Sequence, residues 1–180
     1  MTVSVRRPVQ EDIDAVAAIE AECFSEPWSA QAFMDVLYRD DVVLLVADAA
    51  EQTGLSELAG EDAGESAALS EASAETDPVG NSTHLIAGYV CMYMAADEGE
   101  ITNVAVREDF RKMGVADMLM DELIRVAGAH GMEKIFLEVR ESNIPAISLY
   151  QKKGFSQCGV RKAFYRNPVE AALLMVKELA

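Results

Sequence analysis

Two spacings of apolar residues divide the chain into predicted helices and strands. Apolar residues recurring every three or four positions predict helices over Glu11–Glu22, Ser29–Tyr38, Gly114–Ala129 and Asn143–Lys153. Shorter runs rich in β-branched and aromatic residues predict strands between these helices. The predicted strands span Val3–Arg7, Val42–Ala47, His84–Met94, Glu100–Val106, Lys134–Val139, Phe155–Arg161 and Ala171–Glu178.

Small and polar residues mark the ends of these elements. Ser29 and Asn143 are expected to cap the second and fourth helices, because each side chain can accept a hydrogen bond from a first-turn N–H group. Gly131 and Gly154 are expected to end the last two helices. A turn is expected at Ala96–Gly99, between two strands.

The order of the elements predicts an α/β fold with a central mixed sheet and helices on both faces. Strands that alternate with helices favour parallel pairing, and strands joined by short turns favour antiparallel pairing. We expect a single domain over residues 1–180. Residues 51–82 stand apart, with eight acidic side chains and no basic or aromatic ones. This composition predicts a disordered or weakly helical insertion in a surface loop, either tolerated or regulatory.

The acidic composition limits the classes of partner. A net charge of −16 argues against nucleic acid or an anionic membrane as the main partner, since both require a basic surface. It favours a cationic peptide or amine, although solubility alone also accounts for acidity. The longest apolar stretch, Leu85–Ala96, is too short to span a bilayer, and the first residues lack a signal-peptide pattern. We therefore expect a cytoplasmic protein.

The cysteines and histidines indicate neither a disulfide framework nor a metal site. Cys23, Cys91 and Cys158 lie far apart in sequence and are expected to be small apolar core residues. His84 and His130 are not at metal-ligand spacing to any cysteine or to each other. No resident metal is expected.

Arg111–Ala116 follows a predicted strand and opens the third helix. A helix start offers free N–H groups and the positive end of a dipole, which suits a phosphate. Gly114 allows the backbone to approach such a ligand closely, although a glycine here is also common in ordinary turns. The segment is neither a Walker loop nor a dinucleotide fingerprint, because both glycine patterns are absent.

Two further blocks follow this segment, Leu137–Asn143 and Ala146–Phe155. Together with Arg111–Ala116, these blocks resemble the GCN5-related N-acetyltransferase (GNAT) superfamily. Its pattern has R-x-x-G-x-A at the start of the central helix and ends with N-x-x-A-x-x-L-Y-x-x-x-G-F. The narrower similarity is to the bacterial ribosomal-protein-alanine N-acetyltransferases (RimI type). It is carried by Phe24–Ser29, Ile101–Val106, Leu137–Arg140 and Arg161–Tyr165. The resemblance covers the chain except residues 51–82, and Ala116 stands where many relatives have glycine.

The resemblance implies acetyl-CoA as co-substrate and a direct transfer without a covalent enzyme intermediate. It implies backbone contacts to the pantetheine arm and acetyl carbonyl from Val104, Ala105 and Val106. It implies pyrophosphate contacts, mainly through N–H groups, from Lys112, Met113, Gly114, Val115, Ala116 and Asp117, with added charge from Arg111 and Lys112. It also implies a cofactor contact from Asn143.

Two side chains carry the implied chemistry. Glu138 lies in the middle of an apolar strand and either points outward or faces a cleft, where burial would raise its pKa. The resemblance implies that it is the general base. Tyr150 shares a helix face with Asn143 and Ile147, which by itself suggests a packing residue. The resemblance implies that its hydroxyl protonates the leaving thiolate.

The implied acceptor is a protein N-terminus, namely the N-terminal alanine of the eighteenth protein of the small ribosomal subunit. Another N-terminus, a lysine or a small amine is the sibling alternative. A non-catalytic acyl-CoA-binding sensor is the alternative from another class, and the presence of both Glu138 and Tyr150 argues against it. Trp28 and Tyr165 are either substrate-groove aromatics, by resemblance, or core residues. We expect a monomer.

Overall fold

The computed structural model describes residues 2–50 and 84–179, so the predicted insertion at 51–82 lies outside the described residues. Seven strands form one sheet with four helices packed on it. The helices are α1 (Ile13–Cys23), α2 (Ala30–Val36), α3 (Val115–Ala129) and α4 (Ile144–Lys152). The strands are β1 (Thr2–Arg6), β2 (Val42–Ala50), β3 (His84–Ala95), β4 (Glu98–Val106), β5 (Lys134–Arg140), β6 (Ser156–Arg166) and β7 (Val169–Glu178).

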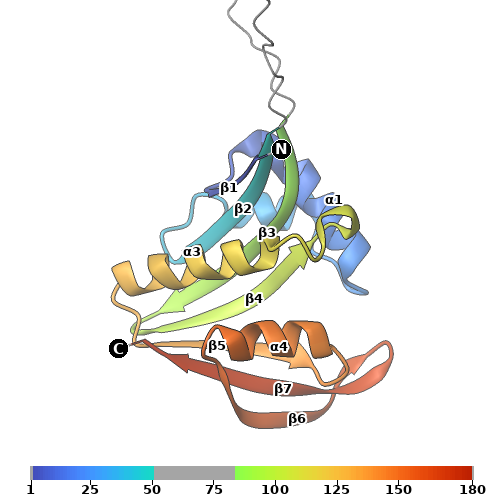
Figure 1. The fold of residues 1–180 in the computed structure, drawn as a ribbon, viewed down its shortest axis with the longest axis vertical. Coiled ribbons are helices and arrows are strands. Elements are labelled where there is room, and N and C mark those ends of the chain that lie inside the picture. Colours follow the sequence, from blue (N-terminus) through green and yellow to red (C-terminus); the bar gives the residue numbers. More distant parts are fainter. Residues whose placement is uncertain (1, 51–83, 180) are drawn as a thin grey trace, which may run out of the picture.

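The sheet is mixed, as predicted. Its strand order is β1-β2-β3-β4-β5-β7-β6, so β7 lies between β5 and β6. Among the strands that the structure describes, the β4–β5 pair alone is parallel, because α3 makes the crossover between these strands, and the other pairs are antiparallel. Figure 1 shows the parallel pair at the centre of the sheet.

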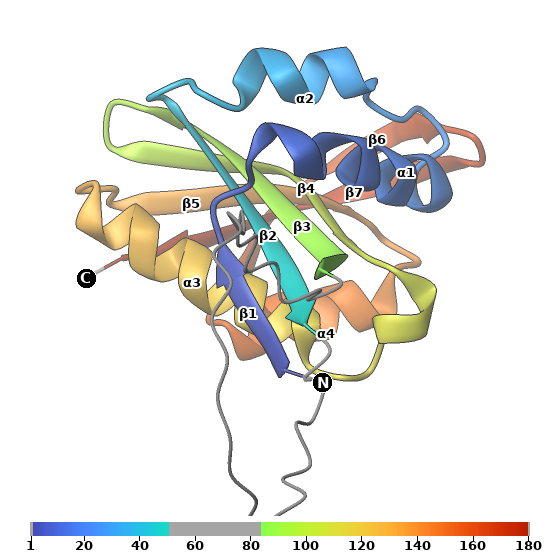
Figure 2. The same cartoon turned by 90° about the horizontal axis from the view of Figure 1, so that it is seen from above.

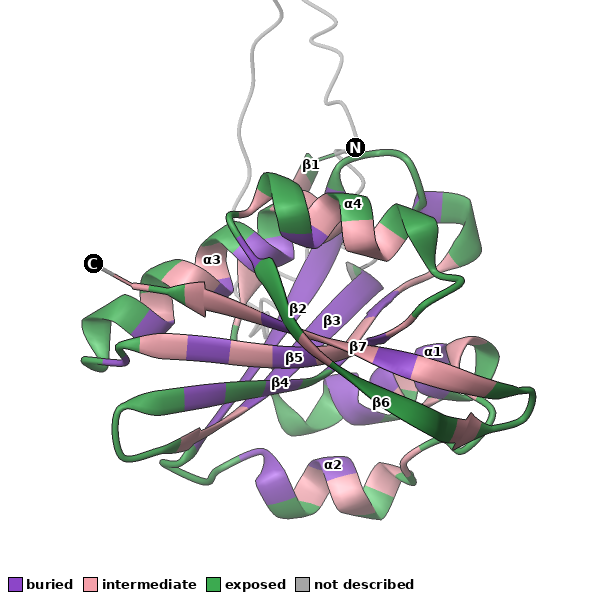
Figure 3. Ribbon diagram, turned by 90° about the horizontal axis from the view of Figure 1, so that it is seen from below, coloured by how far each residue is buried: buried purple, intermediate pink, exposed green. Residues whose placement is uncertain are grey.

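Helices cover both faces of the sheet. Figure 2 shows α1 and α2 over one face and α3 and α4 over the other. Each face has its own apolar cluster: Phe33 and Tyr89 belong to the first, and Leu119 and Ile135 to the second. β2 is buried along almost its whole length because it contributes to both clusters, whereas β6 is exposed (Figure 3). None of the described helices is long and apolar enough to cross a membrane.

The predicted caps and helix ends are confirmed. The Ser29 side chain accepts a hydrogen bond from the Ala32 N–H at 3.2 Å, and Asn143 accepts one from Ala146 at 3.3 Å. Gly131 and Gly154 have φ angles of 75° and 86°, in the left-handed region where a glycine ends a helix without strain.

The predicted turn at Ala96–Gly99 is wrong in its second half, because β4 already begins at Glu98. The chain reverses over Ala96 and Asp97 alone, with Ala96 at a φ of 53°. Gly99 is a strand residue, and a Cβ at this position would lie 2.7 Å from the Sδ of Met92. The lack of a side chain at Gly99 therefore allows close packing between β3 and β4 and plays no part in the turn.

The cysteine expectation holds for one thiol and fails for another. All three cysteines are free thiols, and Cys91 is a buried core residue as expected. Cys158 is exposed, as is almost the whole of its strand β6 at the edge of the sheet. Cys23 is half-buried at the end of α1.

Candidate active site

Strands β4 and β5 separate part-way along their length and open a cleft. They pair in parallel only as far as Ile101 and Leu137, and beyond these residues they diverge (Figure 1). A cavity of about 560 Å³ lies at this opening. Because no described strand pairs with this edge of β4 after Ile101, backbone groups on the edge can bind an extended ligand in the manner of an added strand.

A β-bulge at Thr102 reverses the faces to which the side chains of β4 point in the part of the strand that borders the cleft. Ile101 pairs with Met92 and Asn103 pairs with Cys91, so Thr102 is an extra residue in β4. Ile101 packs in the α3-side cluster, whereas the Asn103 side chain faces α1. In a regular strand two residues at this spacing would share a face. The bulge therefore directs the Asn103 amide toward α1.

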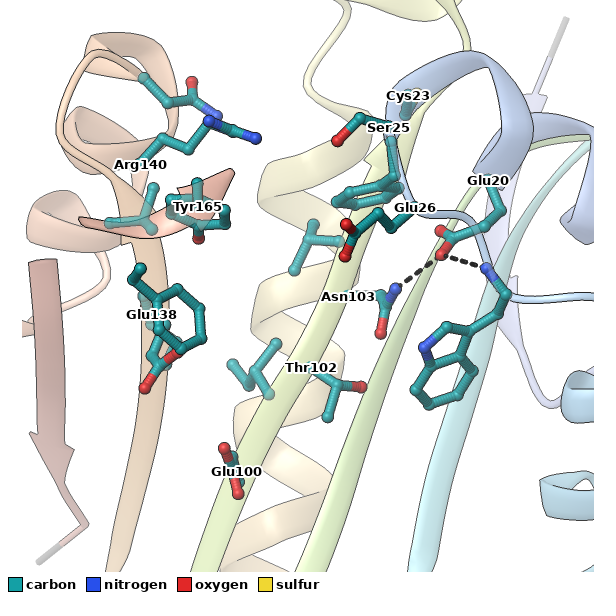
Figure 4. A pocket seen from close by; sticks show the side chains of 18 of the residues that line it. Glu20, Cys23, Ser25, Glu26, Glu100, Thr102, Asn103, Glu138, Arg140 and Tyr165 are labelled. Carbon is teal, nitrogen blue, oxygen red and sulfur yellow. Dashed lines mark hydrogen bonds between the residues drawn. The ribbon is translucent and has the colours of Figure 1, made fainter. Parts of the chain in front are cut away.

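Glu20 of α1 is the buried centre of a hydrogen-bond network at the cleft. Its carboxylate is fully buried and accepts hydrogen bonds from Asn103 Nδ2 at 2.9 Å and from the Trp28 N–H at 3.1 Å (Figure 4). The hydroxyl of Tyr89 donates a third. These contacts join α1, β3, β4 and the loop before α2, and so fix the part of the cleft wall formed by that loop.

Replacement of this carboxylate is expected to destabilise the fold. Glu20→Ala removes the acceptor shared by three donors, two of them on the buried residues Tyr89 and Asn103, so we expect the free energy of unfolding to fall by about 3 kcal/mol. Urea unfolding followed by circular dichroism measures the change. Glu22→Ala, at an exposed position of the same helix, is the matched control and should change stability by less than about 0.5 kcal/mol. Equal stability of the two variants would contradict a structural role for the network.

Glu138 lies on the β5 wall of the cleft, immediately after pairing with β4 ends. Its neighbours Leu137 and Val139 are buried on one face of the sheet, and Glu138 is half-buried on the other. Its Oε1 lies 2.8 Å from Nη1 of Arg161. Burial raises the pKa of Glu138 above its ordinary value, the Arg161 charge opposes this increase, and the Glu100 charge adds to it. A cleft carboxylate with a raised pKa is suited to accept a proton near neutral pH.

Tyr150 projects from α4 and also lines the cleft. It is 7% exposed, and its ring packs on Phe155 with 6.0 Å between centroids. Burial, with a smaller contribution from Tyr165, raises the pKa of the phenol to about 12. The hydroxyl is therefore protonated at neutral pH and can donate a proton or a hydrogen bond into the cleft.

The β6–β7 hairpin forms the outer wall of the cleft and is fixed to the end of β5. Arg140 donates to the carbonyl oxygen of Asn167 at 3.1 Å and to Glu170 at 3.2 Å. Its guanidinium lies 4.0 Å from the ring centroid of Tyr165. Glu170 in turn accepts a hydrogen bond from the Ser142 N–H at 2.5 Å. These contacts hold the Tyr165 ring at the cleft.

The two aromatic residues predicted for a substrate groove both line the cleft. Trp28 also packs on Phe33, with ring centroids 5.5 Å apart, and on Tyr93 at 6.3 Å. Tyr165 packs edge-on against Phe164 at 5.2 Å. Trp28 packs against the apolar cluster beneath α1 and α2, whereas Tyr165 belongs to neither apolar cluster. Both rings border the cavity, and a role in binding the substrate stays a prediction.

Gly114 begins α3 at the end of the loop that follows β4. Its φ is 82°, it provides no side-chain cap, and a Cβ at this position would meet nothing within 4 Å. Lys112 also has a left-handed φ, of 63°. No side chain caps the first-turn N–H groups of α3, and uncapped N–H groups at a helix start are suited to bind an anion.

Two charged side chains near this loop have partners within the protein. The Arg111 Nε donates to the Val106 carbonyl oxygen at 3.2 Å, so its charge is held against β4. Asp117 lies 2.7 Å from Lys152 and 3.0 Å from Lys153, and these ion pairs tie the start of α3 to the end of α4. Any contact from Asp117 to a phosphate would therefore come from its N–H group, as the resemblance implies.

The predicted site residues fall into two groups. Four of them line the cleft together, namely Val104, Glu138, Asn143 and Tyr150. The others form the end of β4, the loop and the first turn of α3, and do not line this cavity: Ala105, Val106, Lys112, Met113, Gly114, Val115, Ala116 and Asp117. The side chains of Ala105, Val106 and Val115 belong to the apolar clusters, so only their backbones remain available to a ligand.

Sequence reasoning gave no separate role to Glu20, Asn103 or Arg161. Glu20 follows Ile19 within the apolar stripe of its helix, and a charged residue beside core positions is the one signal that could have indicated burial. No sequence signal reveals the bulge that turns Asn103 toward it. Arg161 reaches Glu138 across β7, which lies between their two strands.

The sequence pattern of the Acetyltransferase (GNAT) family matches residues 13–155, which is most of the chain. The chain belongs to this family. It is therefore an N-acetyltransferase of the GNAT type.

The chain is 28% identical over 172 residues to a Bacillus subtilis protein named as a candidate ribosomal protein bS18-alanine N-acetyltransferase, covering 96% of this chain and 93% of that protein. It is 35% identical over 80 residues to the Salmonella typhimurium ribosomal protein bS18-alanine N-acetyltransferase, covering 44% of this chain and 54% of that enzyme.

Solved structures share the GNAT fold. The Escherichia coli ribosomal-protein-S18-alanine N-acetyltransferase superposes with a TM-score of 0.73 at 22% identity, over 99% of this chain and 95% of that one. Arabidopsis thaliana NAA60 in complex with acetyl-CoA superposes with a TM-score of 0.73 at 19% identity, over 99% of both chains. The predicted mixed sheet with helices on both faces is confirmed as this fold.

Proposed function

We propose that this GNAT N-acetyltransferase transfers the acetyl group of acetyl-CoA to the N-terminal α-amine of a protein. The first candidate acceptor is the N-terminal alanine of ribosomal protein bS18, the eighteenth protein of the small subunit. One observation carries the proposal: a half-buried carboxylate, Glu138, and a buried phenol, Tyr150, line one cleft beside the open edge of β4. The names of the relatives at 28% and 35% identity support the choice of acceptor.

The cleft and the loop at Gly114 fit acetyl-CoA as co-substrate. The open edge of β4 from Asn103 to Val106 offers backbone groups to the amides of a pantetheine arm. At the end of this edge, the uncapped start of α3 offers N–H groups to a pyrophosphate. Asn143 lines the cleft as well as capping α4, so its amide N–H₂ group is free to contact the co-substrate.

The two cleft side chains would handle the two protons of the reaction. As the amine nitrogen bonds to the thioester carbonyl carbon and the C–S bond breaks, Glu138 accepts the proton lost by the amine, directly or through a water. Tyr150 gives its proton to the departing sulfur. The N–H groups at the open edge of β4 stabilise the negative charge on the carbonyl oxygen. Neither step needs a covalent bond to the enzyme.

The chemistry of the acceptor favours an α-amine over a lysine. At pH 7 about one α-amino group in ten is neutral and nucleophilic, compared with fewer than about one lysine in a thousand. A base of modest strength such as Glu138 is sufficient for the former. Glu20, Glu26, Glu100 and Glu138 also bring more negative than positive charge to the cavity, which favours the approach of an ammonium group or a basic peptide.

The test is thiol release from acetyl-CoA with an Ala-initial basic peptide as acceptor. We expect steady release with this peptide, and none above the peptide-free background when its α-amine is blocked by formylation. Release that persists with the blocked peptide would indicate acetylation of a lysine. Tight binding of acetyl-CoA without release for any peptide or small amine would indicate a non-catalytic sensor.

A further inference from the structure

Arg161 contacts the Glu138 carboxylate from a different strand of the sheet. Its Nη1 lies 2.8 Å from Glu138 Oε1, and its guanidinium lies 5.5 Å from the ring centroid of Phe164. The strands of the two charged residues are separated by β7, so the arginine spans one strand to reach the cleft. An exposed arginine would be expected to remain in solvent, and here it is held by a carboxylate and a ring together.

The local shape of β6 turns its residues toward this contact. Between Arg161, opposite Ala172, and Tyr165, opposite Glu170, β6 has two more residues than β7, and Ala163 adopts a left-handed φ of 50°. This irregularity brings Phe164 and Tyr165 to the cleft lining beside Arg161.

We propose that Arg161 is a positioning residue that keeps the Glu138 carboxylate ionised and directed into the cleft. This inference rests on the proposed function, in which Glu138 is the base. The two oxygens of Glu138 divide the work: Oε1 is held by Arg161, which leaves Oε2 to accept the proton of the amine. Arg161 itself touches neither the amine nor the thioester.

Several other charged or titratable groups face Glu138, and Arg161 is the cation in direct contact with it among the described residues. Glu100, on β4 across the opening, has the opposite effect, because its negative charge favours protonation of Glu138. Leu174 of β7, directly opposite Glu138 in the register, contributes no charge. Glu138 also borders a second cavity, of about 340 Å³, together with Glu100 and Arg161. The remaining titratable groups that line this cavity or the cleft are Tyr93, Glu98, Arg140, Tyr150, Tyr165, Arg166, Glu20, Cys23 and Glu26.

The test is the pH dependence of kcat/KM for Arg161→Gln. Loss of the cation lets Glu138 hold its proton to higher pH. The acidic limb of the profile, where kcat/KM falls as the pH decreases, should therefore move up by about 0.5 to 1 pH unit. Arg161→Lys, which keeps the charge, should restore much of the original limb. Lys162→Gln removes the same charge from the next residue of β6 and should leave the limb in place. In Glu100→Gln, which lacks the opposing carboxylate, 1 M KCl should move the limb in the same direction, because it screens the exposed ion pair.

The outcomes separate this inference from the proposed function. The acceptor α-amine has its own pKa of about 7.7 to 8.0, so the limb of Glu138 is read after the ionisation of the amine has been divided out. If Glu138→Gln removes this limb but Arg161→Gln leaves it unmoved, Arg161 does not act on the base, although Glu138 remains the base. If Glu138→Gln retains the limb, Glu138 is not the base and the proposed mechanism fails. Thermal unfolding checks that Arg161→Gln folds; if it does not, the salt series on Glu100→Gln decides, and a limb that ignores salt would overturn the proposal.

Discussion

Glu138→Gln is expected to lower kcat/KM for acetyl transfer by about 10²- to 10⁴-fold, the usual contribution of a positioned general base. The amide has nearly the same shape as the carboxylate but cannot accept a proton at neutral pH. In wild type, burial raises the pKa of Glu138. Because the ionised form is the active one, activity should fall as the pH decreases through this raised pKa. The acidic limb should therefore lie above the ordinary glutamate range.

Kinetics of the purified variant across the pH range measures this effect. Glu100→Gln is the matched control, because it removes a carboxylate from the opposite wall of the same cleft. Its kcat/KM should stay within a few-fold of wild type at neutral pH, with the acidic limb slightly lower, since the Glu100 charge helps to raise the pKa of Glu138. Full activity of Glu138→Gln at every pH would exclude Glu138 as the base.

Tyr150→Phe is expected to lower kcat by about 10²- to 10³-fold with little change in acetyl-CoA affinity. A thiolate leaves more readily when a nearby acid protonates it, and the phenol, with a pKa of about 12, is fully protonated at neutral pH. Phenylalanine keeps the ring that packs on Phe155. We therefore expect the fold to lose at most about 1 kcal/mol.

Titration calorimetry with acetyl-CoA and steady-state kinetics together distinguish this role from a structural one. Tyr89→Phe is the control, because it removes a phenol hydroxyl that donates to Glu20. That variant should lose stability while retaining kcat. Unchanged turnover of Tyr150→Phe would remove Tyr150 from the mechanism, and an equal loss of kcat in both variants would indicate a packing effect.

Much of the fold could be predicted from the sequence because its signals are local. The apolar stripe of α3, the capping side chains Ser29 and Asn143, and the helix-ending glycines each act within a few residues of themselves. The strands were placed for the same reason, although β6 and β7 extend further than predicted. Their hairpin ends, 162–166 and 169–170, mix apolar and charged residues, and Ala163 has a left-handed φ, so a regular strand pattern is interrupted there.

The geometry of the site could be predicted only in part. The apolar strand around Glu138 did not determine whether its side chain points outward or faces a cleft. The structure places Glu138 at the cleft because pairing between β4 and β5 ends one residue earlier. The end of a strand pairing depends on the packing of both strands against the rest of the sheet. No property of a single strand determines it.

The buried network and the ion pair could not be predicted at all. Asn103 lies 83 residues from Glu20 in sequence, and their contact requires the bulge at Thr102, which reverses the side-chain alternation expected from the sequence. Arg161 reaches Glu138 across β7, and the position of β7 between β5 and β6 follows from the topology of the whole sheet. Such contacts follow from the assembled fold and not from local pattern.

The position of the transferred acetyl group tests the central claim most directly. An Ala-initial peptide that also contains one internal lysine offers both amines at equal concentration. After incubation with the enzyme and acetyl-CoA, fragment-ion mass spectrometry locates the modification. We predict acetylation of the alanine α-amine, with the lysine unmodified. Acetyl groups on the lysine alone, or on neither amine despite bound acetyl-CoA, would contradict the account.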